Sequence, residues 1–140
     1  MRIIGLLFLA GTAIAQAPTF RPVATVSQIM ISITYPYSDA LLYIERNPPQ
    51  QDRDWEALER QALMLAESGN LLMMEGRAKD QGEWMKDARL LVEAGIAGVK
   101  ATHAKDLQAV LALNDQIVTA CTTCHTQYHP RYLRRRANNK

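Results

Sequence analysis

Residues Cys121-Thr122-Thr123-Cys124-His125 form the stretch around which the rest of the chain is organised. It holds the only two cysteines of the sequence, three positions apart, with a histidine directly after the second. On a helix, positions three apart share a face, so both thiols can reach the two vinyl groups along one porphyrin edge. His125 projects from nearly the same face, where a neutral imidazole nitrogen can ligate iron. The pattern is the C-x-x-C-H signature of covalent c-type haem attachment.

A C-x-x-C pair has three other uses: a disulfide, a thiol redox pair, or half of a zinc site. A zinc site needs further ligands at metal spacing, and the sequence has no second cysteine pair. A thioredoxin-like pair follows a strand and opens a helix, where the dipole lowers the thiol pKa. No strand pattern precedes Cys121. We therefore predict one haem c attached to Cys121 and Cys124, with His125 ligating its iron, and keep a thiol oxidoreductase as the minor alternative.

The first fifteen residues have the organisation of a secretory signal peptide. Arg2 gives a positive start, residues 3–10 form an apolar core, and Ala13-Ile14-Ala15 is an A-x-A cleavage site. The apolar run is too short to span a bilayer. We expect cleavage before Gln16 and a periplasmic protein with no membrane span. Export agrees with the motif, because covalent haem attachment takes place outside the cytoplasm.

The remaining segment, residues 16–140, is long enough for one domain with one core. It shows no internal repeat and no second domain boundary. The full sequence has 16 Lys and Arg against 14 Asp and Glu, so losing Arg2 leaves a net charge of about +1 before two haem propionates are counted. This balance gives no indication of nucleic-acid binding.

Four stretches carry apolar residues at three- and four-residue steps, the spacing of amphipathic helices. We expect helices over about 22–45, from Asp52 or Asp54 to near Gly76, over about 81–104, and from the cap Asp106 to Pro130. Pro36 cannot donate to the carbonyl of Ser32, so the first helix should kink or break there. The predicted fold is all-α: an antiparallel up-down-up-down four-helix bundle with haem near the C-terminal end of the last helix.

The predicted inner faces of the first and last helices decide which side chains can meet a haem. On the first we place Val23, Val26, Met30, Ile33, Tyr37, Leu41 and Ile44. On the last we place Leu107, Val110, Leu111, Ile117, Val118, Cys121, Cys124 and Tyr128.

A haem motif on the last helix of a four-helix chain resembles the class II cytochromes c, the cytochrome c′ family. The resemblance covers essentially the whole mature chain, although only the haem-binding stretch is specific. Family members carry C-x-x-C-H followed by a tyrosine and an arginine, three and four residues after the histidine. Here Tyr128 has the tyrosine position, which implies a haem contact. His129 replaces the arginine, with Arg131 nearby as a substitute, so the partner of the haem edge stays open.

The resemblance also implies a haem-facing residue early in the first helix, a methionine in low-spin members and an apolar residue in the cytochromes c′ proper. In the predicted topology, the haem end lies beside the start of helix one, the end of helix two and the start of helix three. The candidate sixth ligands there are Met30, Met73, Met74 and Met85. Met30 matches the family position, and Ile31 takes its place if the alignment shifts by one. Met30 as simple core filling is the alternative.

The remaining polar residues suggest no catalytic site. The sequence shows no nucleophile–base constellation and no paired carboxylates, so we expect a protein that is not an enzyme. His103 should lie at the far end from the haem, and His129 is too close to His125 to reach the opposite iron face. Trp84 is a core residue at the haem end. Four arginines, Arg131, Arg134, Arg135 and Arg136, form either a solvated tail or a patch that steers an acidic redox partner.

Two functions follow from these expectations. The first is a periplasmic electron carrier with a six-coordinate His125–Met30 haem, serving a redox partner protein whose identity the sequence does not give. The second is a five-coordinate protein that binds nitric oxide or carbon monoxide on an open haem face. Family members often dimerise through their first two helices, which makes a homodimer one expectation.

Overall fold

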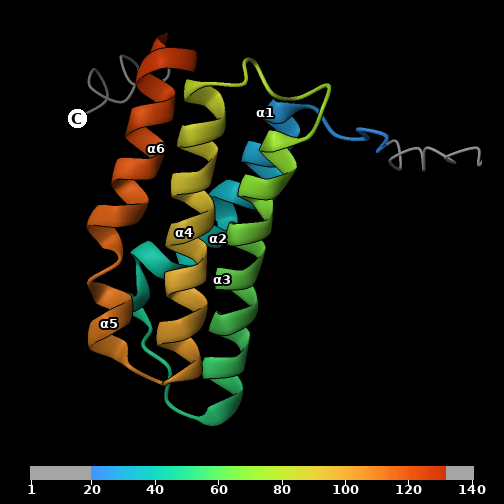
Figure 1. Ribbon diagram of the computed structural model, residues 1–140. Coiled ribbons are helices and arrows are strands. Elements are labelled where there is room, and N and C mark those ends of the chain that lie inside the picture. Colours follow the sequence, from blue (N-terminus) through green and yellow to red (C-terminus); the bar gives the residue numbers. More distant parts are fainter. Residues whose placement is uncertain (1–19, 132–140) are drawn as a thin grey trace, which may run out of the picture.

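The computed structural model describes residues 20–131, which are helical and contain no strand. The first helical region consists of α1 (Val26–Ile29), the π-helical segment η1 (Met30–Thr34), α2 (Tyr35–Leu42) and the 3₁₀ turn η2 (Ile44–Arg46). It is followed by α3 (Asp52–Met73), α4 (Glu83–His103), α5 (Leu107–Leu111) and α6 (Asn114–Tyr128). The first region, α3, α4 and α6 pack together as four helices (Figure 1). The expected all-α class is confirmed for this part of the chain.

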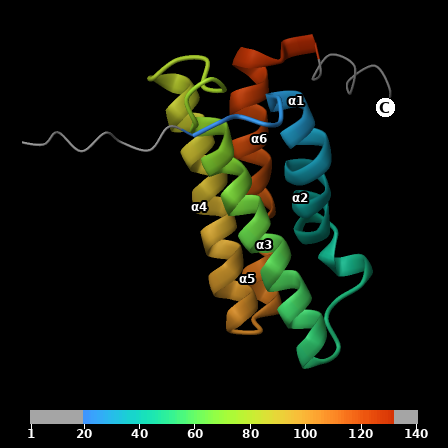
Figure 2. The same ribbon diagram turned by 90° about the vertical axis from the view of Figure 1, so that its right-hand side faces the viewer.

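Helices α3 and α4 lie side by side and run in opposite directions (Figures 1 and 2). At one end, the indole Nε1 of Trp84 donates to the carbonyl of Leu72 at 2.8 Å. At the other end, Lys105 Nζ lies 2.8 Å from Asp52 Oδ1. Between them the backbones approach closely, since a Cβ added at Gly95 would lie 2.4 Å from the backbone nitrogen of Ala66. A side chain at this position would therefore push the two helices apart.

Helix α6 packs against the other side of α4, and α2 packs against both α3 and α6. The ring of Trp84 meets the ring of Tyr128 edge to face, with centroids 4.9 Å apart. The start of α4 therefore lies beside the end of α6. Both views place this junction and α1 at the same end of the molecule (Figures 1 and 2).

The first helix is not broken at Pro36 but is interrupted just before it by the π-helical segment. There the Tyr35 N–H donates to the carbonyl of Met30, five residues back. The wider turn lets the helix continue through Pro36, which stands in the first turn of α2 and has no N–H to donate. Ile29 and Thr34, five apart, are both buried. Of the predicted stripe, Leu41 and Ile44 are buried, and Val26, Met30, Ile33 and Tyr37 are partly buried. Val23 lies before the helix and is 91% exposed, so its placement on the inner face was wrong.

The predicted boundaries of the other helices are close to the observed ones, except that the last helix is divided. Asp106 caps as expected, accepting from the Ala109 N–H at 3.0 Å. The last helix, however, is divided into α5 and α6 by a tight turn at Ala112 and Leu113, in which the Leu113 N–H donates to Val110 and the Leu113 side chain is buried. No proline or glycine marks this break in the sequence. Val118, placed on the inner face by the sequence, is 48% exposed.

Two predictions fall outside the described residues, namely the signal peptide of residues 1–15 and the tail arginines Arg134, Arg135 and Arg136. Within residues 20–131, no helix is long and apolar enough to cross a membrane.

Candidate functional site

The three residues of the haem motif lie in the second half of α6. Cys121, Cys124 and His125 are each half-buried, on the side of the helix that continues the buried positions Ile117 and Ala120. The i, i+3 and i, i+4 spacing places their side chains on one face, as predicted. Because α6 begins at Asn114, both thiols lie well away from the positive end of the helix dipole.

The electrostatic environment favours the neutral form of His125. Burial is the main cause of the lowered pKa of His125, and the nearby His129 lowers it further. The two imidazole rings have centroids 6.0 Å apart. A neutral imidazole has a nitrogen lone pair available, which is the form that ligates a metal.

The thiol of Cys124 is held in its protonated form. Burial raises its pKa to about 11, and the negative charges of Asp87 and Cys121 contribute in the same direction. A nucleophilic redox cysteine needs the opposite, namely a lowered pKa near a helix N-terminus or a cation. Among the described residues, no group of three or more His, Cys, Asp or Glu side chains could hold a metal ion.

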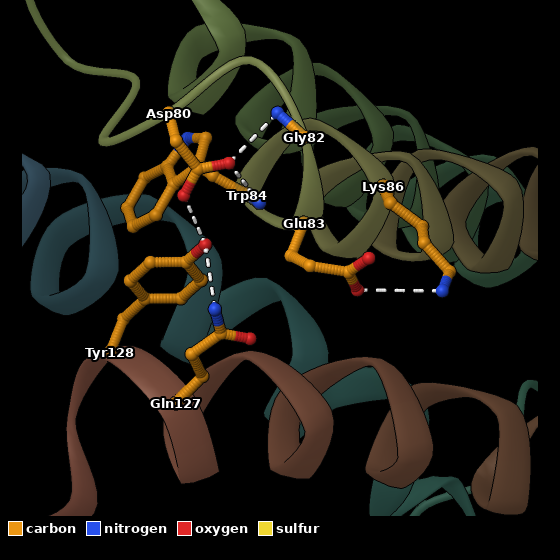
Figure 3. Close-up of polar contacts among 7 residues, drawn as sticks. All are labelled: Asp80, Gly82, Glu83, Trp84, Lys86, Gln127 and Tyr128. Carbon is orange, nitrogen blue, oxygen red and sulfur yellow. Dashed lines mark hydrogen bonds and ion pairs between the residues drawn. The ribbon is translucent and has the colours of Figure 1, made fainter.

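Tyr128 is fixed at the C-terminal end of α6 by a short hydrogen bond from its hydroxyl to the carboxylate of Asp80 (Figure 3). Asp80 also accepts from the backbone N–H groups of Gly82 at 2.8 Å and Trp84 at 3.1 Å. Gln127 Nε2 donates to the Tyr128 hydroxyl at 3.2 Å. One carboxylate therefore caps the start of α4 and holds the end of α6. The predicted haem contact of Tyr128 stays a prediction.

This contact changes the acid–base properties of both partners in opposite directions. The hydrogen bond from Tyr128 is the main cause of the lowered pKa of Asp80. The same bond is the main cause that raises the pKa of Tyr128 to about 12. The pair is therefore most stable as carboxylate and neutral phenol over a wide pH range.

Met30, the predicted sixth ligand, lies in the π-helical segment η1. Its side chain is half-buried and packs against the core, whereas Ile31 is 71% exposed. Of the two residues, Met30 is the one turned toward the interior. The main packing of η1 is against α3, while α6 packs mainly against α4 and α2. The structure thus groups Cys121, Cys124, His125 and Tyr128 on α6, with Met30 on a separate element at the same end of the molecule.

The other candidate sixth ligands, Met73, Met74 and Met85, differ in what their side chains contact. The sulfur of Met74 accepts from Arg77 Nη1 at 2.9 Å, so it already has a partner on the chain. Met73 and Met85 are partly buried against the core, as expected for wall residues. His103 lies at the opposite end of α4 and contacts Glu59 at 3.2 Å, which agrees with the predicted surface role.

Sequence reasoning missed two buried charged residues near this end of the molecule. Arg77 is buried, and its guanidinium donates to the carbonyls of Ala24 and Leu71 at 2.9 and 3.1 Å. It ties the entry of α1 to the end of α3. Asp87 is 2% exposed on α4. Its position three residues after Trp84 was the available signal, because residues three apart share a helix face and a charge beside a core tryptophan needs an explanation.

A surface groove of about 440 Å³ lies between α3 and α4 and is lined by Leu63, Ala66, Glu67, Asn70, Val92, Ile96, Val99, Lys100 and His103. All of these residues belong to α3 and α4, so the groove is separate from the motif on α6.

Comparison with known proteins gives no relative for this chain. No protein-family model matches the sequence, and neither the curated proteins nor the solved structures include a significant match.

Proposed function

We propose that this protein is an exported monohaem c-type cytochrome that acts as a periplasmic electron carrier. In this proposal haem c is attached through Cys121 and Cys124, with His125 as the proximal and Met30 as the distal iron ligand. The packed helices form an antiparallel up-down-up-down bundle with the haem near the C-terminal end of α6. The partner is a redox protein, and the chain itself is not an enzyme.

The observation that carries the proposal is the C-x-x-C-H motif in mid-helix, with all three functional side chains half-buried on one face of α6. A mid-helix position suits thioether formation, because it needs two thiols on one face. It does not suit thiol–disulfide exchange, which needs a stabilised thiolate. The raised pKa of Cys124 and the lowered pKa of His125 favour the same choice.

Each side chain has a distinct role in the proposed site. Cys121 and Cys124 fix the orientation of the group by two covalent bonds, and His125 offers a neutral nitrogen to the iron. The thioether of Met30 favours the reduced iron and so raises the reduction potential. When bound, the haem supplies one-electron chemistry between iron(III) and iron(II). Half-burial of the motif restricts water around the ligands, which also affects the potential.

The test is the mass of the protein matured in a host that attaches haem c. The proposal predicts one added haem that survives denaturation, and a chain that begins at Gln16. The double variant Cys121→Ser/Cys124→Ser is the matched control, because it keeps the helix and removes only the thioethers. It should export normally and carry no covalent haem.

Two outcomes would count against the proposal. An unmodified mass with two thiols or a disulfide would remove the haem and return the thiol interpretation to first place. A haem that is high-spin in both oxidation states and binds carbon monoxide readily would instead favour the five-coordinate gas-binding protein.

A further inference from the structure

A buried carboxylate lies across from the haem motif, on the neighbouring helix. Asp87 is 2% exposed, and neither of its carboxylate oxygens has a hydrogen-bond partner in the described part of the chain. Such a group is costly to bury. Asp87 is therefore the side chain near the site that most requires an explanation.

The register between α4 and α6 places Asp87 opposite Cys124. The two helices run in opposite directions with Trp84 against Tyr128 at 4.9 Å. Asp87 is three residues further along α4, and Cys124 is four residues back along α6. The negative charge of Asp87 also helps to raise the pKa of Cys124, which places the two groups within electrostatic reach.

Most of the surroundings of Asp87 favour the neutral form of its carboxyl group. Burial is the main cause of its raised pKa, Glu83 and Asp80 raise it further, and Lys86 lowers it. The ammonium of Lys86 lies 3.4 Å from Glu83, so it is already shared with an exposed carboxylate (Figure 3). On α6, the facing titratable groups are Cys124 and Tyr128.

We propose that Asp87, in its ionised form, lowers the reduction potential of the haem by placing a negative charge beside the edge attached to Cys124. This inference rests on the proposed function. Reduction adds one electron from a donor protein to iron(III), with no bond formed or broken. The oxidised state carries one more positive charge, so a nearby carboxylate stabilises it more than the reduced state. In the low-dielectric interior this difference is larger than in water, and the potential is lowered.

The test compares haem-loaded wild type with Asp87→Asn by redox titration with soluble mediators. The substitution keeps the shape and removes the charge. We expect the equilibrium constant for reduction to rise at least tenfold, which corresponds to 59 mV for a one-electron couple. Absorption spectra of both oxidation states should stay unchanged, because the iron ligands are the same. A merely structural role for Asp87 would not move the potential while leaving the spectra intact.

Glu83→Gln is the matched control, since Glu83 lies one turn earlier on α4 and its side chain is 57% exposed. Its potential should stay close to that of the wild type. If Asp87→Asn does not fold, Asp87→Ser supplies a second neutral variant with the same expected rise, and Asp87→Glu, which keeps the charge, should keep the potential.

The outcomes separate this inference from the proposed function. If neutral variants carry haem and have the wild-type potential, Asp87 does not set it, and the cytochrome proposal stands. A wild-type protein without covalent haem contradicts the proposed function and this inference together.

Discussion

The Tyr128 hydroxyl donates to the Asp80 carboxylate across 48 positions of sequence. This contact joins the last residue of α6 to the segment that leads into α4. Because Asp80 also caps α4 through Gly82 and Trp84, a single side chain determines where two helices meet. The same end of the molecule carries the haem motif, so this contact contributes to the position of the motif.

Ultraviolet titration of the tyrosines should show the Asp80–Tyr128 contact directly. We expect the Tyr128 phenol to ionise with a pKa of about 12, because its proton is shared with a carboxylate. Asp80→Asn should bring this pKa back toward the ordinary value of 10.0. Tyr128→Phe shows which step of the titration curve belongs to Tyr128, because that step is absent in this variant. An unchanged titration curve in Asp80→Asn would show that the two groups do not interact in solution.

The contact should also make stability depend on acid pH. The folded pKa of Asp80 is below its ordinary value of 3.8, so its stabilising contribution is present above 3.8 and is lost as the pH falls through the lower folded value. Tyr128→Phe removes this contribution. The difference in urea midpoint between wild type and variant should therefore be larger at neutral pH and shrink below 3.8. A difference that stays constant well below 3.8 would contradict the assignment.

The close approach of α3 and α4 predicts unequal effects of two glycine substitutions. In Gly95→Ala, the new Cβ meets the Ala66 backbone at 2.4 Å, so we expect a loss of about 1–3 kcal/mol from overpacking. In Gly98→Ala, the atom nearest to the new Cβ is the Ala62 methyl at 3.0 Å, so the crowding is smaller. The higher helix propensity of alanine, worth up to about 1 kcal/mol, offsets part of the destabilisation. Urea unfolding measures both. Equal losses would mean that the helices can separate more easily than the packing implies.

Met30→Leu tests the distal ligand. The two side chains have similar volume and apolar character, so the stability of the fold should change by less than about 1.5 kcal/mol. The iron should lose its sixth ligand, become high-spin when reduced and bind carbon monoxide readily. Ile31→Leu is the control, because Ile31 is 71% exposed and should leave the spectrum unchanged. If the wild type binds carbon monoxide as readily as Met30→Leu, Met30 is a wall residue.

Helical periodicity was sufficient to predict the helical class and the approximate extents of α3 and α4. Those helices have regular apolar stripes and clear ends, such as Asp106 after α4. The π-helical segment was not predictable, because Pro36 indicates a lost hydrogen bond without saying how the chain adapts. The turn at Ala112 and Leu113 was missed because no proline or glycine marks it in the sequence.

The candidate site was predictable where its residues are close in sequence. Cys121, Cys124 and His125 share a motif, so their common face followed from helix geometry. Contacts between distant residues did not follow, because nothing in the sequence pairs Asp80 with Tyr128 or brings Asp87 toward Cys124. These depend on the relative register of helices α4 and α6.

The short connection between α3 and α4 also has consequences for the order of folding. The contact between Leu72 and Trp84 in this hairpin spans 12 positions, whereas the contact of Tyr128 with Asp80, at the motif end of α6, spans 48. We expect the hairpin to form in the transition state and α6 to dock later. Gly95→Ala should then slow folding, and Tyr128→Phe should mainly speed unfolding, as stopped-flow measurements can show. Residues 121–125 would be enclosed last, which leaves them accessible to modifying enzymes for the longest part of folding.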